Sequence, residues 1–184
     1  LWLRGLAGIG PRDDAGDRAA AVPDQLDHLG LRHHGDAAGI DVVGISHFGT
    51  FLKNTESYRR DLRRVEYGDE RDPKMAETFD RISPLNHANR ITSKLFVAQG
   101  RNDPRVPWTE AEQIVKAVRA NGQPVWYLLY ADEGHGFHRP ENSIAFNGVV
   151  EGFLATNLGG RAEAMGEVLA ASTAQIPAGR EFIA

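Results

Sequence analysis

The sequence predicts an α/β fold of three layers around a mostly parallel sheet. Two short runs of apolar, β-forming residues, at 94–99 and 125–130, each end in a polar loop, and a helical pattern lies between them. Their nearly continuous apolar character is typical of strands that are buried on both faces. Because strands that alternate with helices are joined by right-handed crossovers, we expect these strands to be parallel.

Each element has its own pattern. The run IDVVGI at 40–45 predicts a first strand, and KLFVAQ at 94–99 predicts a second strand that ends at a glycine. We expect the strand at 94–99 to lie between those at 40–45 and 125–130. The intervening helix is predicted by one apolar face, with a capping box at its start and Asn121-Gly122 at its end. The apolar face comprises Ala111, Ile114, Val115 and Val118, and the capping box pairs Thr109 with Glu112. A last helix is predicted by the spacing of Phe146, Val149, Val150, Phe153 and Leu154.

An acid and a histidine lie in the loops that follow two of these strands. Asp103 belongs to GRNDPRVP at 100–107, and His135 belongs to EGHGF at 133–137. Because parallel strands end at the same edge of a sheet, we expect both side chains there. An Asp103 carboxylate oxygen should lie within about 2.6–3.2 Å of a ring nitrogen of His135.

The two residue types suit proton transfer. A neutral imidazole can take a proton from a hydroxyl near pH 7 and return it to a leaving group, which contributes roughly 10²–10⁴-fold in rate. A buried carboxylate on the other ring nitrogen fixes the tautomer and stabilises the imidazolium. His135 is therefore the candidate base and Asp103 the candidate acid that orients it. The glycines beside His135 permit a tight turn that leaves the ring accessible.

Residues from about 39 to 157 resemble the C-terminal part of the catalytic domain of the prolyl oligopeptidase family of serine peptidases. The resemblance rests on NDPRVP at 102–107, EGHGF at 133–137, ISPL at 82–85 and the charged segment at 58–69. It implies part of an α/β-hydrolase fold and hydrolysis of a peptide substrate, without a cofactor, through a Ser-Asp-His triad. Asp103 and His135 match two members of that triad.

The resemblance also suggests residues that bind substrate. Arg105 matches a position that binds a substrate carbonyl in some members, although an arginine that holds the acid loop in place is an equal alternative. Phe48 and Phe51 follow the first strand, whose loop contributes to the specificity pocket in the family. Either ring could line that pocket, and simple core packing is the alternative.

The third triad member is missing from the sequence. The family carries its nucleophile in a Gly-x-Ser-x-Gly elbow, and no serine of this chain has glycine at both −2 and +2. The serines are Ser46, Ser57, Ser83, Ser93, Ser143 and Ser172. Ser46 comes nearest, but we interpret it as a polar residue at a strand end. We therefore expect this chain to be inactive as a peptidase by itself.

Residues 1–38 have an unusual composition. They include six Asp and four Arg but no Ser, Thr, Lys, Glu, Asn, Phe, Tyr or Met. We hypothesise out-of-frame translation of GC-rich DNA, joined to the native frame near residues 38–39; a divergent or disordered arm is the alternative. The chain then divides into 1–38, a hydrolase part at 39–160 and a tail at 161–184 with one short helix. A start at Leu1, without methionine before Met75, is typical of a fragment.

Composition narrows the possible partners. A net charge of −4 and 41% hydrophobic residues indicate neither a nucleic-acid nor a membrane partner, and no apolar run approaches ~18 residues. The absence of cysteine excludes disulfides and thiolate chemistry. His33 and His34 with Asp36 could suggest a metal site, but solvated histidines are favoured, and no metal is expected. Compartment and oligomeric state stay open.

Two other functions remain compatible with the sequence. The same triad hydrolyses esters, so an esterase or an enzyme like dienelactone hydrolase is one alternative. A non-catalytic α/β module that binds a peptide or partner is the other. A Gly-x-Ser-x-Gly codon series in another frame, upstream of Gly39, would distinguish an enzyme from such a module.

Overall fold

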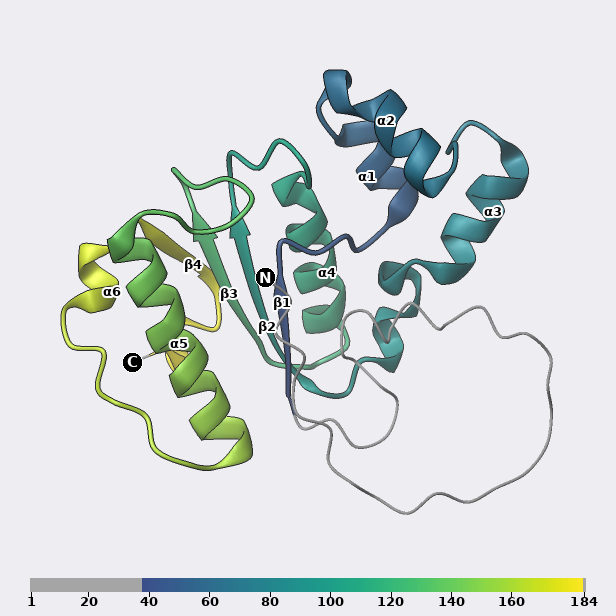
Figure 1. Ribbon diagram of the computed structural model, residues 1–184. Helices are drawn as coiled ribbons and strands as arrows, with labels where there is room; N and C mark the ends of the chain where they lie inside the picture. The colour runs from purple at the N-terminus through teal and green to yellow at the C-terminus, as the bar shows by residue number, and fades with distance from the viewer. Residues whose placement is uncertain (1–37, 184) are drawn as a thin grey trace, which may run out of the picture.

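The computed structural model describes residues 38–183, which form three layers around a four-stranded sheet (Figure 1). The strands are β1 (Ala38–Val42), β2 (Lys94–Gly100), β3 (Val125–Tyr130) and β4 (Ala174–Ala178). Their order in the sheet is β1-β2-β3-β4, with β1, β2 and β3 parallel and β4 antiparallel to β3. The expected central position of the strand at 94–99 is confirmed.

Helices cover both faces of the sheet. The longer ones are α1 (Phe48–Asn54), α2 (Ser57–Tyr67), α3 (Pro73–Ile82), α4 (Trp108–Ala120) and α5 (Pro140–Leu158). Shorter elements are the 3₁₀ segments η2 (Pro84–Arg90) and η3 (Arg180–Phe182) and the helix α6 (Val168–Ala171). α4 packs on one face of β2 and β3 and α5 on the other (Figure 1). Both faces of these strands are therefore buried, which explains their continuous apolar sequences.

The first strand ends three residues earlier than the sequence predicts. β1 stops at Val42 because Val43 has a φ of 53°, in the left-handed region that breaks an extended strand. The Val43 N–H still donates to the carbonyl oxygen of Ala98, at 3.0 Å. Residues 43–45 therefore turn away from the sheet toward α1.

The start of α4 also differs from the prediction. The helix begins at Trp108, with Pro107 at the cap position, and no side chain forms a capping hydrogen bond there. The proposed pairing of Thr109 with Glu112 as a capping box is therefore wrong. The predicted end is confirmed, because Asn121 is the C-cap and Gly122 has a φ of 78°.

The C-terminal tail adds a strand that the sequence analysis does not predict. One short helix, α6, occurs as expected, and it is followed by β4, which pairs with β3. Tyr127 pairs with Ala178 and Tyr130 with Ala174, with an irregularity between them. The tail is thus part of the sheet, whereas the division of the chain at 160 stays a prediction.

Helices α1 to α3 form a second lobe beside the sheet, joined to α4 through a buried carboxylate. Glu110 Oε2 accepts hydrogen bonds from the backbone N–H groups of Ser46, at 3.2 Å, and His47, at 2.9 Å. Its Oε1 accepts one from the Thr50 hydroxyl, at 2.6 Å. Glu110 is fully buried, so these bonds fix the first turn of α1 against α4.

Two further expectations concern the N-terminal segment and membrane-spanning helices. Residues 1–37, including His33, His34 and Asp36, lie outside the described residues, so the frame-shift and metal hypotheses there stay predictions. No helix within residues 38–183 is long and apolar enough to cross a membrane.

A close backbone contact between the loops after β2 and β3 yields the first testable prediction. A Cβ on Gly100 would lie 2.2 Å from the carbonyl oxygen of Gly134 and 2.6 Å from that of Glu133. We expect Gly100→Ala to force the loops apart and lower the free energy of unfolding by about 1–3 kcal/mol, measured by urea denaturation. Gly134→Ala is the control, because its Cβ would meet only the Asn102 carbonyl oxygen, at 3.7 Å. Equal destabilisation by both variants would contradict the prediction.

Candidate active site

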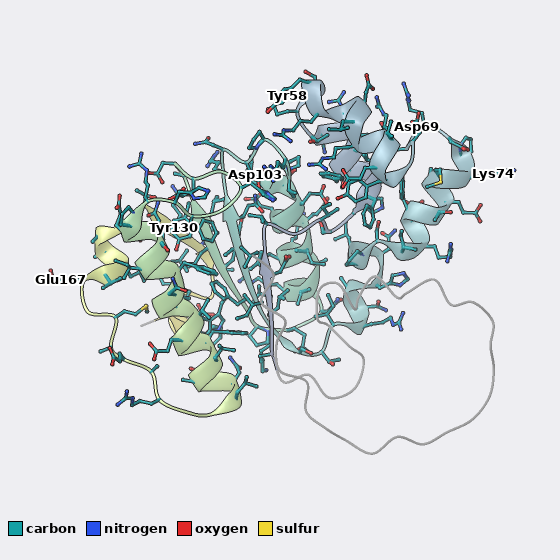
Figure 2. The ribbon with its side chains drawn as sticks, viewed as in Figure 1. Tyr58, Asp69, Lys74, Asp103, Tyr130 and Glu167 are labelled. Carbon is teal, nitrogen blue, oxygen red and sulfur yellow. The ribbon has the colours of Figure 1, made fainter. Side chains whose placement is uncertain are left out.

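The carboxyl ends of β2 and β3 bring two loops together at one edge of the sheet (Figure 2). The Arg101 N–H donates to the Tyr130 carbonyl oxygen, and the Asn102 N–H donates to the Glu133 carbonyl oxygen, each at 2.9 Å. The Asn102 side-chain amide donates to the Ala131 carbonyl oxygen, at 3.1 Å. The hydrogen bonding of the sheet thus continues into the loops and fixes their relative position.

Asp103 lies in the loop at 100–107, here called the acid loop, and His135 lies in the loop at 131–139, here called the histidine loop. The two side chains meet between these loops. Oδ2 of Asp103 lies 2.7 Å from Nδ1 of His135, within the range that the sequence analysis expects. The Asp103 side chain is fully buried, whereas 31% of the His135 side chain is exposed. The acid is therefore shielded from water, and the ring keeps an accessible side.

The second oxygen of Asp103 is held by its own loop. Oδ1 accepts hydrogen bonds from the backbone N–H groups of Arg105, at 2.7 Å, and Val106, at 3.1 Å. Burial alone would raise the pKa of Asp103, but the hydrogen bond from His135 and these two N–H groups outweigh it and lower the pKa below its usual value. Asp103 is therefore an ionised carboxylate at neutral pH, which accepts a hydrogen bond from the Nδ1–H of His135.

The Gln99 side chain forms hydrogen bonds with both ends of the acid loop. Its side-chain nitrogen lies 3.1 Å from the Gly100 carbonyl oxygen, 3.2 Å from the Val106 carbonyl oxygen and 3.4 Å from Oδ2 of Asp103. All three are acceptors, so the amide nitrogen must face them. Gln99 is fully buried and connects both ends of the loop that carries Asp103.

Glu133 holds the histidine loop in a similar way. Its buried carboxylate accepts hydrogen bonds from the backbone N–H groups of His138, at 3.1 Å, and Arg139, at 2.9 Å, and from the Asn142 side chain, at 2.9 Å. Burial would raise the pKa of Glu133, but these hydrogen bonds outweigh it, and the pKa lies below its ordinary value. The loop around His135 is thus tied to the start of α5.

The proposed substrate-binding residues lie in two different environments. The Arg105 side chain is exposed, while its carbonyl oxygen accepts a hydrogen bond from the Thr55 hydroxyl, at 3.0 Å. Phe48 and Phe51 are 8% and 1% exposed and pack in a cluster with Val106 of the acid loop. Contact with substrate for these three residues stays a prediction.

The hydroxyl of Ser46 forms hydrogen bonds with Glu110. It donates to the carbonyl oxygen of Glu110, at 2.8 Å, and to its carboxylate, at 3.0 Å, and the serine is 2% exposed. Within residues 38–183, Nε2 of His135 has no hydrogen-bond partner.

The described part of the chain also holds no group of three or more acidic or histidine side chains placed to bind a metal ion. The arrangement can orient an imidazole and move a proton.

Two supporting residues were not identified from the sequence. Gln99 carries a weak signal, because it is the one uncharged polar residue inside the apolar run 94–99. Asn142 lies in an ordinary helical segment and gives no signal of its own. Its role depends on its contacts with Glu133 and with Thr173, which are 40 residues apart in the sequence.

Removing the amide of Gln99 should disturb Asp103. We expect Gln99→Met, which keeps the length of the side chain but lacks the donor, to loosen the acid loop. The low-field proton resonance of the His135 Nδ1–H should then broaden or disappear, as measured by proton NMR.

Gln113→Met is the matched control for this variant. The Gln113 amide donates to Ser46, Thr50 and Glu110, at 2.8, 2.9 and 2.9 Å, away from the site. This control should lose about 1–3 kcal/mol of stability and keep the resonance. A resonance lost in both variants would show that Gln99 acts only on global stability.

The lowered pKa of Glu133 predicts a pH-dependent contribution to stability. A depressed pKa in the folded state stabilises the protein above the unfolded pKa of about 4.3, and this contribution is lost as pH falls through the folded value. Glu133→Gln should therefore lower the free energy of unfolding strongly at pH 7 and much less near pH 3. Exposed Glu163 offers the control Glu163→Gln, whose effect should be small at both pH values. A pH-independent difference for Glu133→Gln would refute the prediction.

Comparison with solved structures supports the fold. A puromycin-hydrolysing peptidase from Mycobacterium tuberculosis superimposes with a TM-score of 0.67 at 24% identity, over 76% of this chain and 21% of that chain. An acylaminoacyl peptidase from Pyrococcus horikoshii superimposes with a TM-score of 0.65 at 18% identity, over 79% of this chain and 25% of that chain. At these identities the similarity concerns the α/β-hydrolase fold, of which residues 38–183 form a part.

Sequence comparison identifies the family. Dipeptidyl aminopeptidase BIII from Pseudoxanthomonas mexicana is 44% identical over 150 residues, 80% of this chain and 22% of the relative. Dipeptidyl peptidase family member 6 from Caenorhabditis elegans is 38% identical over 131 residues, 69% of this chain and 18% of the relative. The chain thus spans about a fifth of the length of these relatives. Residues 36–161 match the model of the prolyl oligopeptidase family, and the chain belongs to that family.

Proposed function

We propose that this chain carries the acid and the base of a serine peptidase that hydrolyses peptide bonds. The observation that carries the proposal is the 2.7 Å contact between buried Asp103 and partly exposed His135 at the carboxyl edge of a parallel sheet. Family membership supports the proposal, because the family and the relatives are named as peptidases. Arg105, at the exposed rim of the acid loop, is the proposed contact for a substrate carbonyl.

The roles follow from the geometry. Nδ1 of His135 donates to Asp103, so Nε2 is the free base and takes the proton of a serine hydroxyl as its oxygen attacks the peptide carbonyl. The imidazolium then gives that proton to the departing amine. Water repeats the sequence on the acyl-enzyme and releases the acid. Asp103 stays ionised throughout and stabilises the imidazolium.

No serine of this chain is the nucleophile in this proposal. No serine in the sequence has the Gly-x-Ser-x-Gly context, and Ser46 is bound to Glu110. We therefore propose that the chain by itself has little or no peptidase activity. The N–H group after the nucleophile, which normally stabilises the oxyanion, would be supplied by the same elbow.

A fluorophosphonate probe for active serines tests the proposal. The chain as it stands should remain unlabelled, whereas a version joined to a Gly-x-Ser-x-Gly elbow, read from the DNA upstream of Gly39, should label and cleave short peptides. In that version His135→Ala should abolish labelling, and Asp103→Asn should slow it by about 10⁴-fold.

Asp80→Asn is the matched control. Asp80 lies 3.1 Å from Nε2 of His47, so the described residues contain a second aspartate–histidine contact, in which neither residue belongs to the loops after β2 and β3. Its loss should leave the labelling rate unchanged. Labelling of the present chain at Ser46 would overturn the assignment of the nucleophile.

The same experiment separates the alternatives. Cleavage of esters without cleavage of peptides would identify an esterase or an enzyme like dienelactone hydrolase. A restored version that binds peptides but neither labels nor hydrolyses them would identify a non-catalytic module.

A further inference from the structure

The C-terminal tail contacts the histidine loop from outside the part of the chain that matches the family. The match ends at residue 161, whereas α6 and β4 lie beyond it, next to α5 and β3 (Figure 1). Thr173, between α6 and β4, reaches back by 31 residues to Asn142 and by 41 residues to Asp132. The tail therefore touches both the loop that holds His135 and the helix that follows it.

Thr173 offers two donors to this region. Its backbone N–H donates to Oδ1 of Asn142, at 2.9 Å, and its hydroxyl lies 3.1 Å from the same oxygen. The hydroxyl also donates to Oδ1 of Asp132, and this hydrogen bond lowers the pKa of Asp132 below its usual value. Asp132 is paired in turn with Arg139, at 2.9 Å. Thr173 thus bonds to residues on both sides of the loop.

The backbone N–H of Thr173 contributes to the orientation of Asn142, whereas the single hydroxyl proton goes to Asp132. Because the Asn142 oxygen accepts from Thr173, its amide nitrogen must face the carboxylates of Glu133, at 2.9 Å, and Asp132, at 3.3 Å. Asn142 is fully buried, so a rotated amide would place an oxygen against a carboxylate. The tail therefore keeps a donor on Glu133, the residue that ties down the backbone at 138–139.

We propose that Thr173 is a positioning residue for His135, acting on the loop at 132–139 through its hydroxyl on Asp132 and through its backbone N–H on Asn142 and Glu133. The inference rests on the proposed function for its catalytic meaning, while the effect on the loop is independent of catalysis. It assigns to the tail a part in the site that the family match does not include.

Amide hydrogen exchange in the full chain tests this effect directly. Thr173→Val has nearly the same shape and keeps the backbone N–H on Asn142, but it lacks the hydroxyl that donates to Asp132, the partner of Arg139. We expect the protection of the His138 and Arg139 N–H groups to fall by about tenfold. Protection of the Val97 N–H, in the centre of the sheet, should stay within about twofold, because the expected opening is local. Thr173→Ser should restore the protection of both loop amides.

Ser172→Ala is the matched control. The Ser172 hydroxyl donates to the Leu169 carbonyl oxygen, at 2.7 Å, and accepts from the Ala174 N–H, at 3.2 Å, so it supports the tail without touching the histidine loop. Its removal should leave the protection of His138 and Arg139 unchanged. A loss equal to that in Thr173→Val would mean that the tail acts only through its own folding and would overturn the proposal.

Activity gives a separate measure in the version with a restored elbow. Thr173→Val should lower kcat by about tenfold with KM unchanged, because loop order affects proton transfer rather than substrate binding. If the restored version is inactive but local exchange changes as expected, the proposed function fails and the positioning role stands. Unchanged exchange, or a uniform loss at Val97 as well, would overturn the positioning role.

Discussion

The parallel pairing of β2 with β3 is the constraint on which the candidate site depends. Because both strands end at one edge, Asp103 and His135 emerge side by side although they are 32 residues apart. The pairing continues into the loops through backbone hydrogen bonds, and Gly100 permits the close approach of the chains. The 2.7 Å contact is thus a result of sheet geometry before it is a result of side-chain chemistry.

The acid and the histidine are supported by different kinds of contact. Apart from His135, Asp103 is held by the Gln99 side chain and by the backbone N–H groups of Arg105 and Val106. This support comes from one short stretch of the chain. His135 depends on Glu133 and Asn142, which belong to a loop and a helix, and Asn142 contacts the tail at Thr173. This difference is consistent with their tasks, since the acid stays fixed while the base must remain accessible.

The sequence predicted the sheet order, α4, α5 and the contact of Asp103 with His135, because apolar runs and loop motifs report on local structure. It did not predict that β1 stops at Val42, since a β-branched residue with positive φ is uncommon. It also missed β4 and the roles of Gln99 and Asn142. Those features arise from pairing between distant segments, which no local pattern records. The catalytic and substrate-binding roles of the site residues remain proposals.

The position of Thr173 has a consequence for the order in which the protein is made. A chain that leaves the ribosome from its N-terminus presents β2 and the complete acid loop before β3 exists. The histidine loop follows, but its contact with the tail awaits residue 173, which lies 38 residues after His135. The backbone N–H groups that hold Oδ1 of Asp103 are therefore made before β3, whereas the contacts that hold the loop around His135 are complete only once residue 173 has been added.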